Sequence, residues 1–410
     1  MTDRRVVVTG IGLMSALGTT REAVWHGLVS GRCGIAAVTQ FDTTGYRSQL
    51  AAEIPAYTRD AAYSEKAWRR LSRSDQVAII ASREALDDAG LLEGDVDRAR
   101  IGVLLGSGTA NLMRNEEWFA EMRRVGVRRA SPAKIFNHFP STPSDTVAAT
   151  FGLEGLKASV LSACSSGTVA VGYGADAIRW GQIDAALAGA SDVLCRLTFS
   201  GFNALRLVDT EPCRPFCRTR KGMNLGESAA ILVLEDLSHA RRRAARIYAE
   251  IAGYGVRCEA YHPTAPEPEG RAVADLVHDA LRAARMPPDA VDHVNAHGTA
   301  TPQNDQAEAR GMHLVFGERV RRIPVTSIKS MVGHCLAAAG AIEAAAVAMS
   351  IAHGVVPPTV NYREDDPECD VDVVANEARN VAVTCGVSTS LAFGGNNGAL
   401  VIRRFDGKRA

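Results

Sequence analysis

The sequence of 410 residues has no net charge, no long apolar run and no paired-cysteine pattern. Lys plus Arg and Asp plus Glu both number 46, so no overall charge favours binding to nucleic acid or to an anionic membrane. No stretch reaches the roughly 20 apolar residues of a membrane span, and the charged start, Met1 to Arg5, is unlike a signal peptide. These absences predict a cytoplasmic protein that binds neither nucleic acid nor membrane.

The cysteines argue against disulfides and against a metal site. Nine cysteines are scattered along the chain, an odd number without regular spacing, which fits a reducing cytoplasm better than a disulfide framework. The one close pair, Cys213 and Cys217, has no second pair or nearby His. Structural zinc sites need four ligands, so we expect no metal here.

Strand and helix signals alternate along the chain, which predicts an α/β architecture with a largely buried sheet. A polar, basic stretch, Leu237 to Arg246, separates two parts, and we expect one half at 1–246 and a second at 247–410. Both parts follow the same coarse order of elements, although no residue-level repeat is visible. In the first part the expected strands are 6–8, 101–105, 159–161, 185–189 and 229–234, with helices at 71–90 and 169–180. In the second part the expected strands are 247–256, 291–295 and 399–403, with helices at 271–285 and up to Ser350.

A glycine turn near the start superficially resembles a dinucleotide-binding site. The run Val6 to Val8 is followed by Gly10 and Gly12, and we expect the strand to end at these glycines. The third glycine of the dinucleotide fingerprint is absent, because residues 13–15 contain none. A dehydrogenase is therefore disfavoured.

The stretch around Cys164 predicts a covalent nucleophile. A short strand runs into a turn of small residues at 162–167, and an Ala-rich helix follows. Free N–H groups and the helix dipole favour a thiolate there, so we expect the pKa of Cys164 to lie below its free value of about 8.5. The small neighbours would let a substrate carbonyl reach the sulfur and the N–H groups together, as in an oxyanion site. The alternative is a buried structural cysteine.

Two histidines and a lysine in the second part extend this hypothesis. His297 and His334 each follow a strand-like run, the place where α/β folds present groups to ligands. Lys329 lies five positions before His334. A single histidine of this kind is more often structural, but together with Cys164 the set indicates catalysis.

On these residues the chain resembles the elongating, ketosynthase II-like β-ketoacyl-acyl carrier protein synthases, the condensing enzymes of fatty-acid and polyketide assembly. Four motifs carry the resemblance, and the similarity extends over essentially the whole chain. The Cys-His-His combination is that of elongating synthases, because priming synthases that use acyl-CoA carry Asn in place of the second His. The motifs are Ala163-Cys164-Ser165-Ser166-Gly167, Asn295-Ala296-His297-Gly298-Thr299-Ala300-Thr301, Lys329-Ser330-Met331-Val332-Gly333-His334 and Phe393-Gly394-Gly395-Asn396.

The resemblance implies a thiolase-like fold, with two similar α/β halves in alternating helix and sheet layers, and a decarboxylative Claisen condensation. Cys164 would hold the growing acyl chain as a thioester, and malonyl-acyl carrier protein would lose carbon dioxide to give the attacking enolate. The backbone N–H groups of Cys164 and Phe393 would form one oxyanion hole, and His297 and His334 a second. Removing one such donor typically costs about 3–4 kcal/mol in the barrier.

The resemblance assigns supporting roles to further residues. Lys329 would order the site with Glu343 as its acidic partner, because an unpaired buried ammonium is costly. Phe393 would gate the site, and Gly394 and Gly395 would supply the hinge freedom that such a motion needs. Three threonines would contact the phosphopantetheine arm, although threonines in such places also cap loops: Thr264, Thr299 and Thr301.

The family also implies how substrates and partners bind. No cofactor is expected, because the substrates arrive on the phosphopantetheine of acyl carrier protein. We expect a dimer, either of identical chains or with a chain-length-factor-like subunit. Carrier proteins are acidic, so docking would be electrostatic. One arginine-rich segment is a candidate patch: Arg123, Arg124, Arg128 and Arg129.

Some positions depart from the family pattern. Ala392 replaces the usual glycine before Phe393, and Asn396-Asn397 replaces Thr-Asn, so the gate is expected to be stiffer or differently timed. The stretch Gly226 to Ala229 reads Gly-Glu-Ser-Ala in place of Gly-Glu-Gly-Ala. Phe136 to Pro140 resembles the segment that reaches across the dimer into the partner's acyl pocket. Its His and aromatic residues favour an unsaturated or aryl-primed polyketide chain.

Two alternatives with the same fold remain at this point. A chain-length-factor-like partner subunit would lack the cysteine, and the presence of Cys164 argues against it. A non-condensing acyltransferase would keep the cysteine, but it would not need His297, His334 and Lys329 together. Fatty-acid elongation and polyketide elongation both fit these residues.

Overall fold

Ten strands form the main sheet of the described residues, which are 4–93, 96–132 and 139–407 of the computed structural model. The order of the strands divides the sheet into two series of five. The first series is β5 (Lys157–Val160), β4 (Ile101–Gly106), β6 (Ala185–Asp192), β8 (Ser228–Asp236) and β1 (Val6–Ser15). The second series is β9 (Ala249–Cys258), β15 (Asn396–Arg403), β14 (Cys385–Ser390), β10 (His293–Asn295) and β11 (Val325–Thr326).

The two series have the same strand directions. In each, the three outer strands are parallel, and the two inner strands run antiparallel to their neighbours. They meet at β1 and β9, which share only two register pairs, Val7 with Glu250 and Val8 with Ala249. The two similar halves that the sequence predicts are therefore visible in the sheet. A division of the chain at residue 246 stays a prediction.

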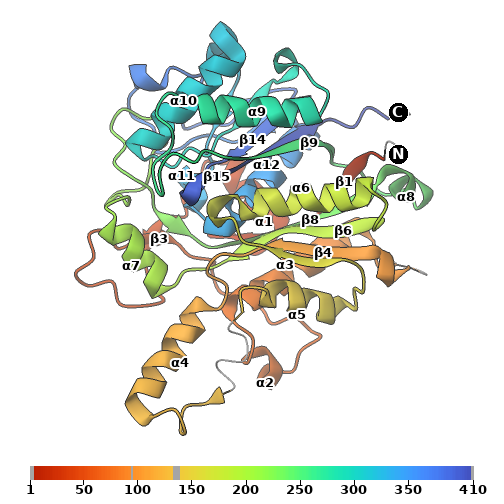
Figure 1. The fold of residues 1–410 in the computed structure, drawn as a ribbon, viewed down its shortest axis with the longest axis vertical. Coiled ribbons are helices and arrows are strands. Elements are labelled where there is room, and N and C mark those ends of the chain that lie inside the picture. The colour runs from red at the N-terminus through yellow and green to blue at the C-terminus, as the bar shows by residue number, and fades with distance from the viewer. Residues whose placement is uncertain (1–3, 94–95, 133–138, 408–410) are drawn as a thin grey trace.

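Helices separate and cover the two series in layers (Figure 1). α6 (Ser166–Arg179) and α12 (Ala339–His353) lie between the series and contact strands of both. α3 (Arg73–Ala89) covers the outer face of the first series, and α9 (Arg271–Ala283), with α10 (Pro302–Phe316) beside it, covers the second. The helix and sheet layers therefore alternate as predicted.

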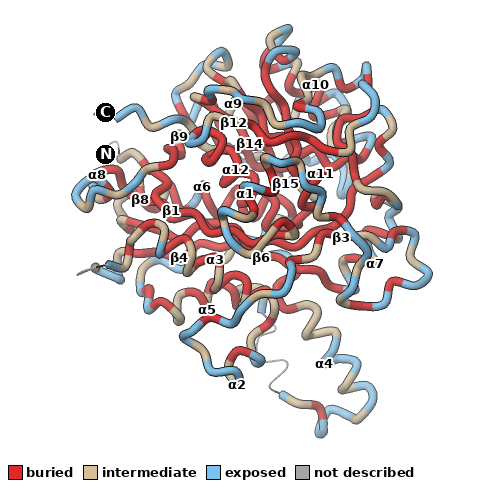
Figure 2. Tube along the Cα trace, turned by 180° about the vertical axis from the view of Figure 1, so that it is seen from behind, coloured by how far each residue is buried: buried red, intermediate tan, exposed pale blue. Residues whose placement is uncertain are grey.

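The middle layer is the most deeply buried part of the molecule (Figure 2). Of the described helices, only the segment Leu336–His353 has the length and apolar composition of a membrane span, and 89% of it is buried inside the molecule. It is a core helix. Its contact with α6 is close, because a Cβ added at Gly167 would lie 2.9 Å from the backbone of both Ala337 and Ala341.

Strand β1 runs further than the sequence predicts. It does not end at Gly10 and Gly12 but continues through both to Ser15. Helix α3 crosses the strand there, and a Cβ at either glycine would collide with a backbone carbonyl oxygen, that of Ala85 or Ala81. These glycines therefore mark a contact between a helix and a strand, and not a turn.

The basic stretch between the two parts is not a simple linker. Its first residues form the helix α8 (Leu237–Arg242), which packs on β1 and β8 through the buried side chains of Leu237 and Ala240. The sequence analysis did not assign several further helices and short strands. The remaining elements are α1 (Arg21–Val29), β2 (Ala36–Ala37), β3 (Leu50–Ala52), α2 (Glu65–Trp68), η1 (Arg98–Arg100), α4 (Leu112–Val125), α5 (Thr142–Phe151), η3 (Ala163–Ser165), α7 (Arg196–Ala204), β7 (Leu225–Gly226), η4 (Pro288–Ala290), η5 (Gly317–Arg322), α11 (Lys329–Val332), η6 (Leu336–Ala338), β12 (Val355–Val356), η7 (Pro367–Cys369), β13 (Arg379–Asn380) and η8 (Phe393–Gly395).

Candidate active site

Cys164 lies in a strained turn between a strand and a helix, as the sequence predicts. Strand β5 leads into the 3-10 turn η3, and α6 follows directly. Ala163 has a left-handed backbone (φ 51°), which sets the direction of the next peptide. No hydrogen bond between described residues uses the backbone N–H of Cys164. The turn therefore presents a sulfur and a free N–H donor side by side.

The predicted ionisation of Cys164 is wrong in direction. Burial raises the pKa of the thiol to about 12, although the charge of Lys329 and a hydrogen bond from the Phe393 backbone N–H both lower it. The prediction considered the helix start but not the surrounding chain, which leaves only 7% of the residue exposed. The thiol is therefore neutral at pH 7 and must lose its proton as it reacts.

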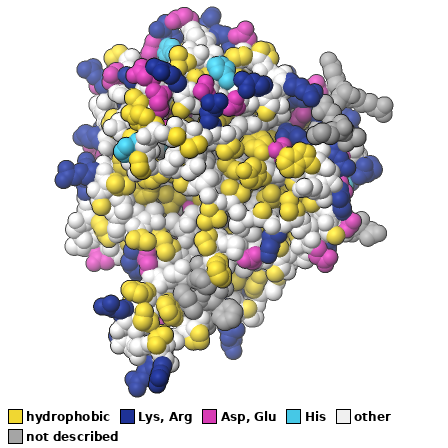
Figure 3. Space-filling view, viewed as in Figure 1, with side chains coloured by type: hydrophobic (Ala, Val, Ile, Leu, Met, Phe, Trp, Pro, Cys, Tyr) yellow, Lys and Arg dark blue, Asp and Glu magenta, His cyan; other side chains and the backbone are white. Residues whose placement is uncertain are grey.

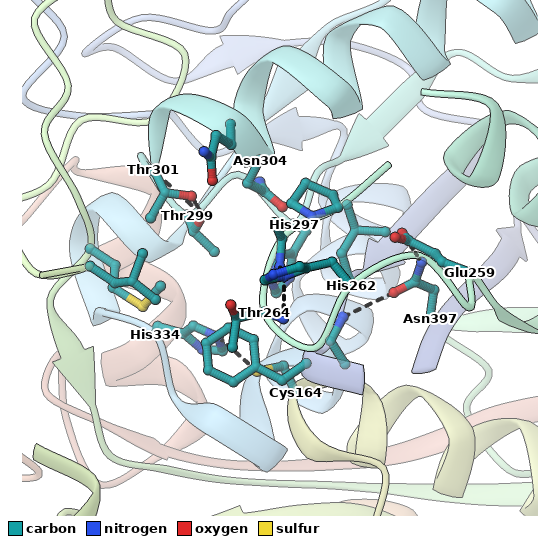
Figure 4. Close-up of a pocket in the computed structure, with 18 of the residues that line it drawn as sticks. Cys164, Glu259, His262, Thr264, His297, Thr299, Thr301, Asn304, His334 and Asn397 are labelled. Atoms are coloured by element: carbon teal, nitrogen blue, oxygen red, sulfur yellow. Dashed lines mark hydrogen bonds between the residues drawn. The ribbon is translucent and has the colours of Figure 1, made fainter. Parts of the chain in front are cut away.

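His334 faces the sulfur from the second half of the molecule. Its Nε2 lies 3.1 Å from Cys164 Sγ (Figure 4). Its Nδ1 accepts a hydrogen bond of 3.1 Å from the backbone N–H of Leu336, which assigns the ring proton to Nε2. Burial and the charge of Lys329 hold the pKa of His334 well below its usual range. The ring is therefore a neutral donor aimed at the nucleophile.

His297 lies beside His334 in the same state. The two ring centroids are 5.3 Å apart, with the rings nearly perpendicular at 86°. Nζ of Lys329 lies 3.3 Å from His297 Nδ1 and, as an ammonium, can only donate to it, so the proton of His297 is also on Nε2. Burial, the Lys329 charge and the neighbouring His334 lower its pKa well below the usual range. Two neutral imidazoles thus offer two N–H donors near one sulfur.

Lys329 and Glu343 form the predicted buried ion pair. Both side chains are 1% exposed, and Lys329 Nζ donates to Glu343 Oε1. Burial raises the pKa of Glu343 to about 7, while the charge of Lys329 and its hydrogen bond lower it. The second carboxyl oxygen of Glu343 has no hydrogen-bond partner among the described residues. The pair therefore holds Lys329 against His297 at the cost of burying a carboxylate.

The threonines line one cavity of about 60 Å³ together with Cys164 and both histidines. Thr299 and Thr301 are buried, and their hydroxyl oxygens are 2.9 Å apart. Thr264 is exposed and lies at the rim, next to His262, whose Nδ1 accepts the backbone N–H of Thr264 at 3.1 Å. Figure 4 shows Thr299 and Thr301 next to each other and Thr264 apart from them. Their position fits an extended ligand that reaches the sulfur.

The loop at Phe393 lines this cavity. The Phe393 ring stacks on Phe202 with centroids 5.5 Å apart. Gly394 (φ 77°) and Gly395 (φ 71°) both have left-handed backbones, which a residue with a Cβ would adopt only with strain. The N–H of Gly394 also donates to Pro263 O at 2.8 Å. Both glycines of the predicted hinge therefore have backbone conformations that favour glycine.

The departures in this loop take part in its hydrogen bonds. The Ser165 hydroxyl donates to Asn396 O at 2.5 Å. Asn397 accepts the N–H of Ala392 at 3.0 Å and donates to Glu259 at 2.5 Å. These bonds tie the loop to the nucleophile turn and to the end of β9. Of the stretch that resembles the segment reaching across the dimer, Phe136 to Pro140, residues 136–138 lie outside the described residues.

Two groups that organise the site escaped the sequence analysis. Glu308, on α10, accepts the backbone N–H groups of His297 (2.7 Å) and Gly298 (2.8 Å) and the Thr389 hydroxyl (2.6 Å). Asp305, one turn earlier, accepts the N–H groups of Ala300 and Phe216. The only signal in the sequence is an Asp and a Glu three positions apart after Pro302, which is common on exposed helices.

Neither metals nor disulfides enter this arrangement among the described residues. No group of three or more His, Cys, Asp or Glu side chains within the described ranges could hold a metal ion. All nine cysteines carry free thiols, including Cys213 and Cys217. The chemistry available at the site is that of a thiol, two neutral imidazoles, an ion pair and backbone N–H donors.

Comparisons with known proteins agree with this chemistry. The family model for the N-terminal domain of beta-ketoacyl synthases matches residues 3–240, and the model for the C-terminal domain matches residues 248–363. The chain is 38% identical over 410 residues to 3-oxoacyl-[acyl-carrier-protein] synthase 2 of Staphylococcus aureus (strain N315), which covers 98% of this chain and 99% of that protein. It is 39% identical over 415 residues to the tetracenomycin polyketide synthase ketoacyl synthase alpha subunit of Streptomyces glaucescens, which covers 98% of this chain and 97% of that protein.

A solved structure gives the same result for the fold. The chain resembles a chain of the ishigamide ketosynthase/chain length factor with a TM-score of 0.94 and 36% identity, over 98% of this chain and 100% of that chain. The predicted thiolase-like fold is therefore confirmed. The chain belongs to the β-ketoacyl synthase family.

Proposed function

We propose that this protein elongates acyl chains by decarboxylative Claisen condensation of malonyl-acyl carrier protein with an acyl group held on Cys164. The observation that carries the proposal is the convergence of His334 Nε2 on Cys164 Sγ at 3.1 Å, with His297 beside it. The chain is about equally similar to a 3-oxoacyl-[acyl-carrier-protein] synthase, at 38% identity, and to a polyketide ketoacyl synthase alpha subunit, at 39%. The proposal therefore covers both kinds of chain.

In the first step Cys164 takes the acyl chain. Its sulfur attacks the thioester carbonyl of acyl-carrier protein, the new C–S bond forms, and the phosphopantetheine thiol leaves with the proton that the cysteine gives up. The negative charge on the carbonyl oxygen is held by the backbone N–H groups of Cys164 and Phe393. Each such donor is worth about 3–4 kcal/mol in the transition state.

In the second step the histidines hold the enolate. The bond between the malonyl carboxylate and its α-carbon breaks, carbon dioxide leaves, and the electron pair moves onto the thioester oxygen between His297 and His334. The α-carbon then attacks the Cys164 thioester, so that a C–C bond forms and the C–S bond breaks. Cys164 leaves as a thiolate and takes up one proton from solvent, which restores the neutral thiol. Neutral imidazoles suit this step because they donate a hydrogen bond to the enolate oxygen. A full positive charge would also stabilise the malonyl carboxylate before it is lost, and that would slow the step.

The supporting residues act on these groups and not on the substrate carbonyls. Lys329, held by Glu343, donates to Nδ1 of His297 and so fixes its proton on Nε2. Thr299 and Thr301, with Thr264 at the rim, are proposed to bind the phosphopantetheine arm. Phe393 with Gly394 and Gly395 is proposed to open the cavity, because Phe393 lines it and both glycines have left-handed backbones. No cofactor is proposed.

The proposal is tested by following the two half-reactions separately. Incubation with acyl-acyl carrier protein, followed by mass spectrometry of the intact protein and of its peptides, should place one acyl group on Cys164. Malonyl-carrier protein should then release carbon dioxide and yield a chain longer by two carbons. Acylation without any carbon dioxide release would instead indicate the non-condensing acyltransferase.

The proposed carrier-protein surface is the arm formed by α4. The helix projects from the body of the molecule, and Lys and Arg side chains gather at its outer end (Figures 1 and 3). The side chains of the arginine patch are all exposed: Arg123, Arg124, Arg128 and Arg129. An acidic carrier protein would be steered to such a patch although the whole chain has no net charge.

A dimer, with an identical chain or with a chain-length-factor-like subunit, is also proposed. Strand β5 forms one edge of the sheet, where a strand of another chain could pair, and Leu161 directly after it is 58% exposed. The similar solved chain comes from a ketosynthase/chain length factor. Sedimentation of a fully active, stable monomer at micromolar concentration would contradict both versions. We also propose that the protein is cytoplasmic and that the boundary between its two halves lies near residue 246.

A further inference from the structure

A buried carboxyl group lies directly behind the turn that follows His334. Asp192 is the last residue of β6 and is fully buried. Its Oδ2 accepts a hydrogen bond of 3.0 Å from the backbone N–H of Ala337. Its Oδ1 accepts the backbone N–H groups of Thr109 (2.8 Å) and Ala110 (3.2 Å) and the Thr109 hydroxyl. One carboxyl group thus joins the end of β6, the loop after β4 and the turn η6.

The turn that Asp192 holds has an unfavourable backbone. Leu336 has a φ of 50°, in the left-handed region that residues with a Cβ rarely adopt. Such a conformation persists only where the surroundings determine it. The N–H group bound by Asp192 belongs to Ala337, so it lies in the peptide that directly follows Leu336. Asp192 therefore fixes the orientation of that peptide.

The same turn selects the tautomer of His334. The backbone N–H of Leu336 donates to His334 Nδ1 at 3.1 Å, which leaves the ring proton on Nε2, 3.1 Å from Cys164 Sγ. If the backbone of Leu336 relaxed, this donor would turn away from Nδ1. The ring could then carry its proton on Nδ1, and Nε2 would have no proton to donate to a substrate oxygen.

We propose that Asp192 is a positioning residue for His334: by holding the N–H of Ala337 it keeps Leu336 in place and His334 in the Nε2–H tautomer. The kinetic part of this inference rests on the proposed condensation, in which His334 donates to the enolate oxygen. The tautomer itself does not depend on that function.

The decisive variant is Asp192→Asn. An asparagine side chain has only one acceptor oxygen. In the wild-type protein three donors bind Oδ1 of Asp192 and one donor binds Oδ2. The amide should therefore turn its oxygen to Thr109 and its NH₂ group to Ala337, which breaks only the bond to η6. Thr109→Val is the matched control, because it removes a bond from the same carboxyl group but keeps the one to Ala337.

We expect Asp192→Asn to lower kcat for malonyl decarboxylation about 100-fold, with KM changed by less than about threefold, since the ring is misdirected and substrate binding is not. The ¹⁵N chemical shifts of His334, assigned by their absence in His334→Gln, should change from an Nε2–H to a mixed or Nδ1–H pattern. In Thr109→Val the His334 signals should keep the Nε2–H pattern. A purely structural role would lower thermal stability without moving these signals.

A folded Asp192→Asn protein that keeps the Nε2–H pattern would overturn the inference, whether or not its rate falls. If the variant does not fold, Asp192→Asn is combined with Leu336→Gly, because glycine adopts the left-handed backbone without strain, and the same two measurements are made. Should the wild-type protein itself release no carbon dioxide, the proposed function fails, while the ¹⁵N pattern still decides the role of Asp192.

Discussion

The nucleophile turn η3 of the first half and the turn η6 of the second half begin alike but have opposite uses. Each begins with a left-handed residue, Ala163 (φ 51°) or Leu336 (φ 50°), and each leads into one of the two central helices. In the first half the next N–H, that of Cys164, is free for a substrate oxygen. In the second half the next N–H, that of Ala337, is occupied by Asp192.

The comparison teaches how a duplicated framework can hold one active site and not two. Turn η3, whose N–H is free, carries the nucleophilic sulfur of Cys164. Turn η6, whose N–H is bound by Asp192, carries no nucleophile but positions His334, the donor that faces the sulfur. A cysteine, Cys335, also lies directly before turn η6. Burial raises the pKa of the Cys335 thiol even more than that of Cys164. The difference between the turns therefore lies in which donors are free and not in the presence of a thiol.

The largest effect should separate the two cysteines. Cys164→Ala should abolish condensation, a loss on the order of 10⁶-fold as for other essential nucleophiles, but leave some malonyl decarboxylation because both histidines remain. Cys335→Ala is the matched control: it also removes a buried thiol, and we expect it to keep activity and the adduct on Cys164. Peptide mapping that found the acyl group on Cys335 would reverse the comparison.

The next effect concerns the two donors of the second half. His334→Ala and His297→Ala should each lower decarboxylation by about 10²–10³-fold, because each removes one hydrogen bond to the enolate oxygen. Burial lowers the pKa of both rings, so they stay neutral as the pH falls through their usual range. The decarboxylation rate between pH 6 and 8 should therefore show no titration of either ring. A loss of rate as pH falls through 6.5 that disappears in one histidine variant would contradict this.

A smaller effect should come from the ion pair behind His297. Lys329→Met leaves Glu343 buried without its partner and should cost about 3–5 kcal/mol of unfolding free energy, together with activity. The double variant with Glu343→Gln should recover stability more than activity, because the charge is gone but His297 still lacks its donor. Thermal unfolding of the single and double variants measures this coupling. Additive losses would mean that the two side chains do not depend on each other.

The same pair predicts a pH dependence of stability. Burial raises the pKa of Glu343 from 4.5 to about 7, so the folded protein binds this proton more tightly than the unfolded chain does. The contribution of Glu343 to stability is therefore full below about pH 4.5 and is lost as the pH rises through about 7. In Glu343→Gln the unfolding free energy should fall less over this interval than in the wild-type protein.

The smallest effect should lie on the surface of the first half. Charge reversal at Arg128 and Arg129 should raise the KM for carrier protein several-fold at low salt and less at physiological salt, because such charges mainly steer association. Charge reversal at Arg321, an exposed arginine of the second half, serves as the control. An unchanged KM at low salt would exclude the segment that follows α4 as the docking surface.

Local sequence and the family resemblance were enough to find the residues of the site but not their surroundings. The turn at Cys164 and both histidines lie where the strand and turn signals predict them, and Lys329 and Glu343 form the pair that the resemblance implies. The pKa of Cys164 was predicted in the wrong direction, because a turn and a helix start can be read locally whereas burial comes from distant segments. Asp192 and Glu308 escaped notice for the same reason, since their partners are backbone groups of other segments.

The glycines of β1 show a similar limit. A strand that ends in glycines is a sound prediction when only turns are considered. Gly10 and Gly12 are instead needed because α3 lies directly against the strand, a contact between residues about 70 positions apart. The alternation of strands and helices could be predicted, but the close packing of one on another could not.

The contact between α6 and α12 joins the two halves through a shared hydrophobic core. Gly167 leaves no room for a side chain between the helices, and one hydrophobic cluster contains residues of β1, α6, α12 and β15. Each half also has a cluster of its own on the outer face of its strands. Cys164 and His334 come from different halves, so a change in the packing between α6 and α12 would alter the distance between them.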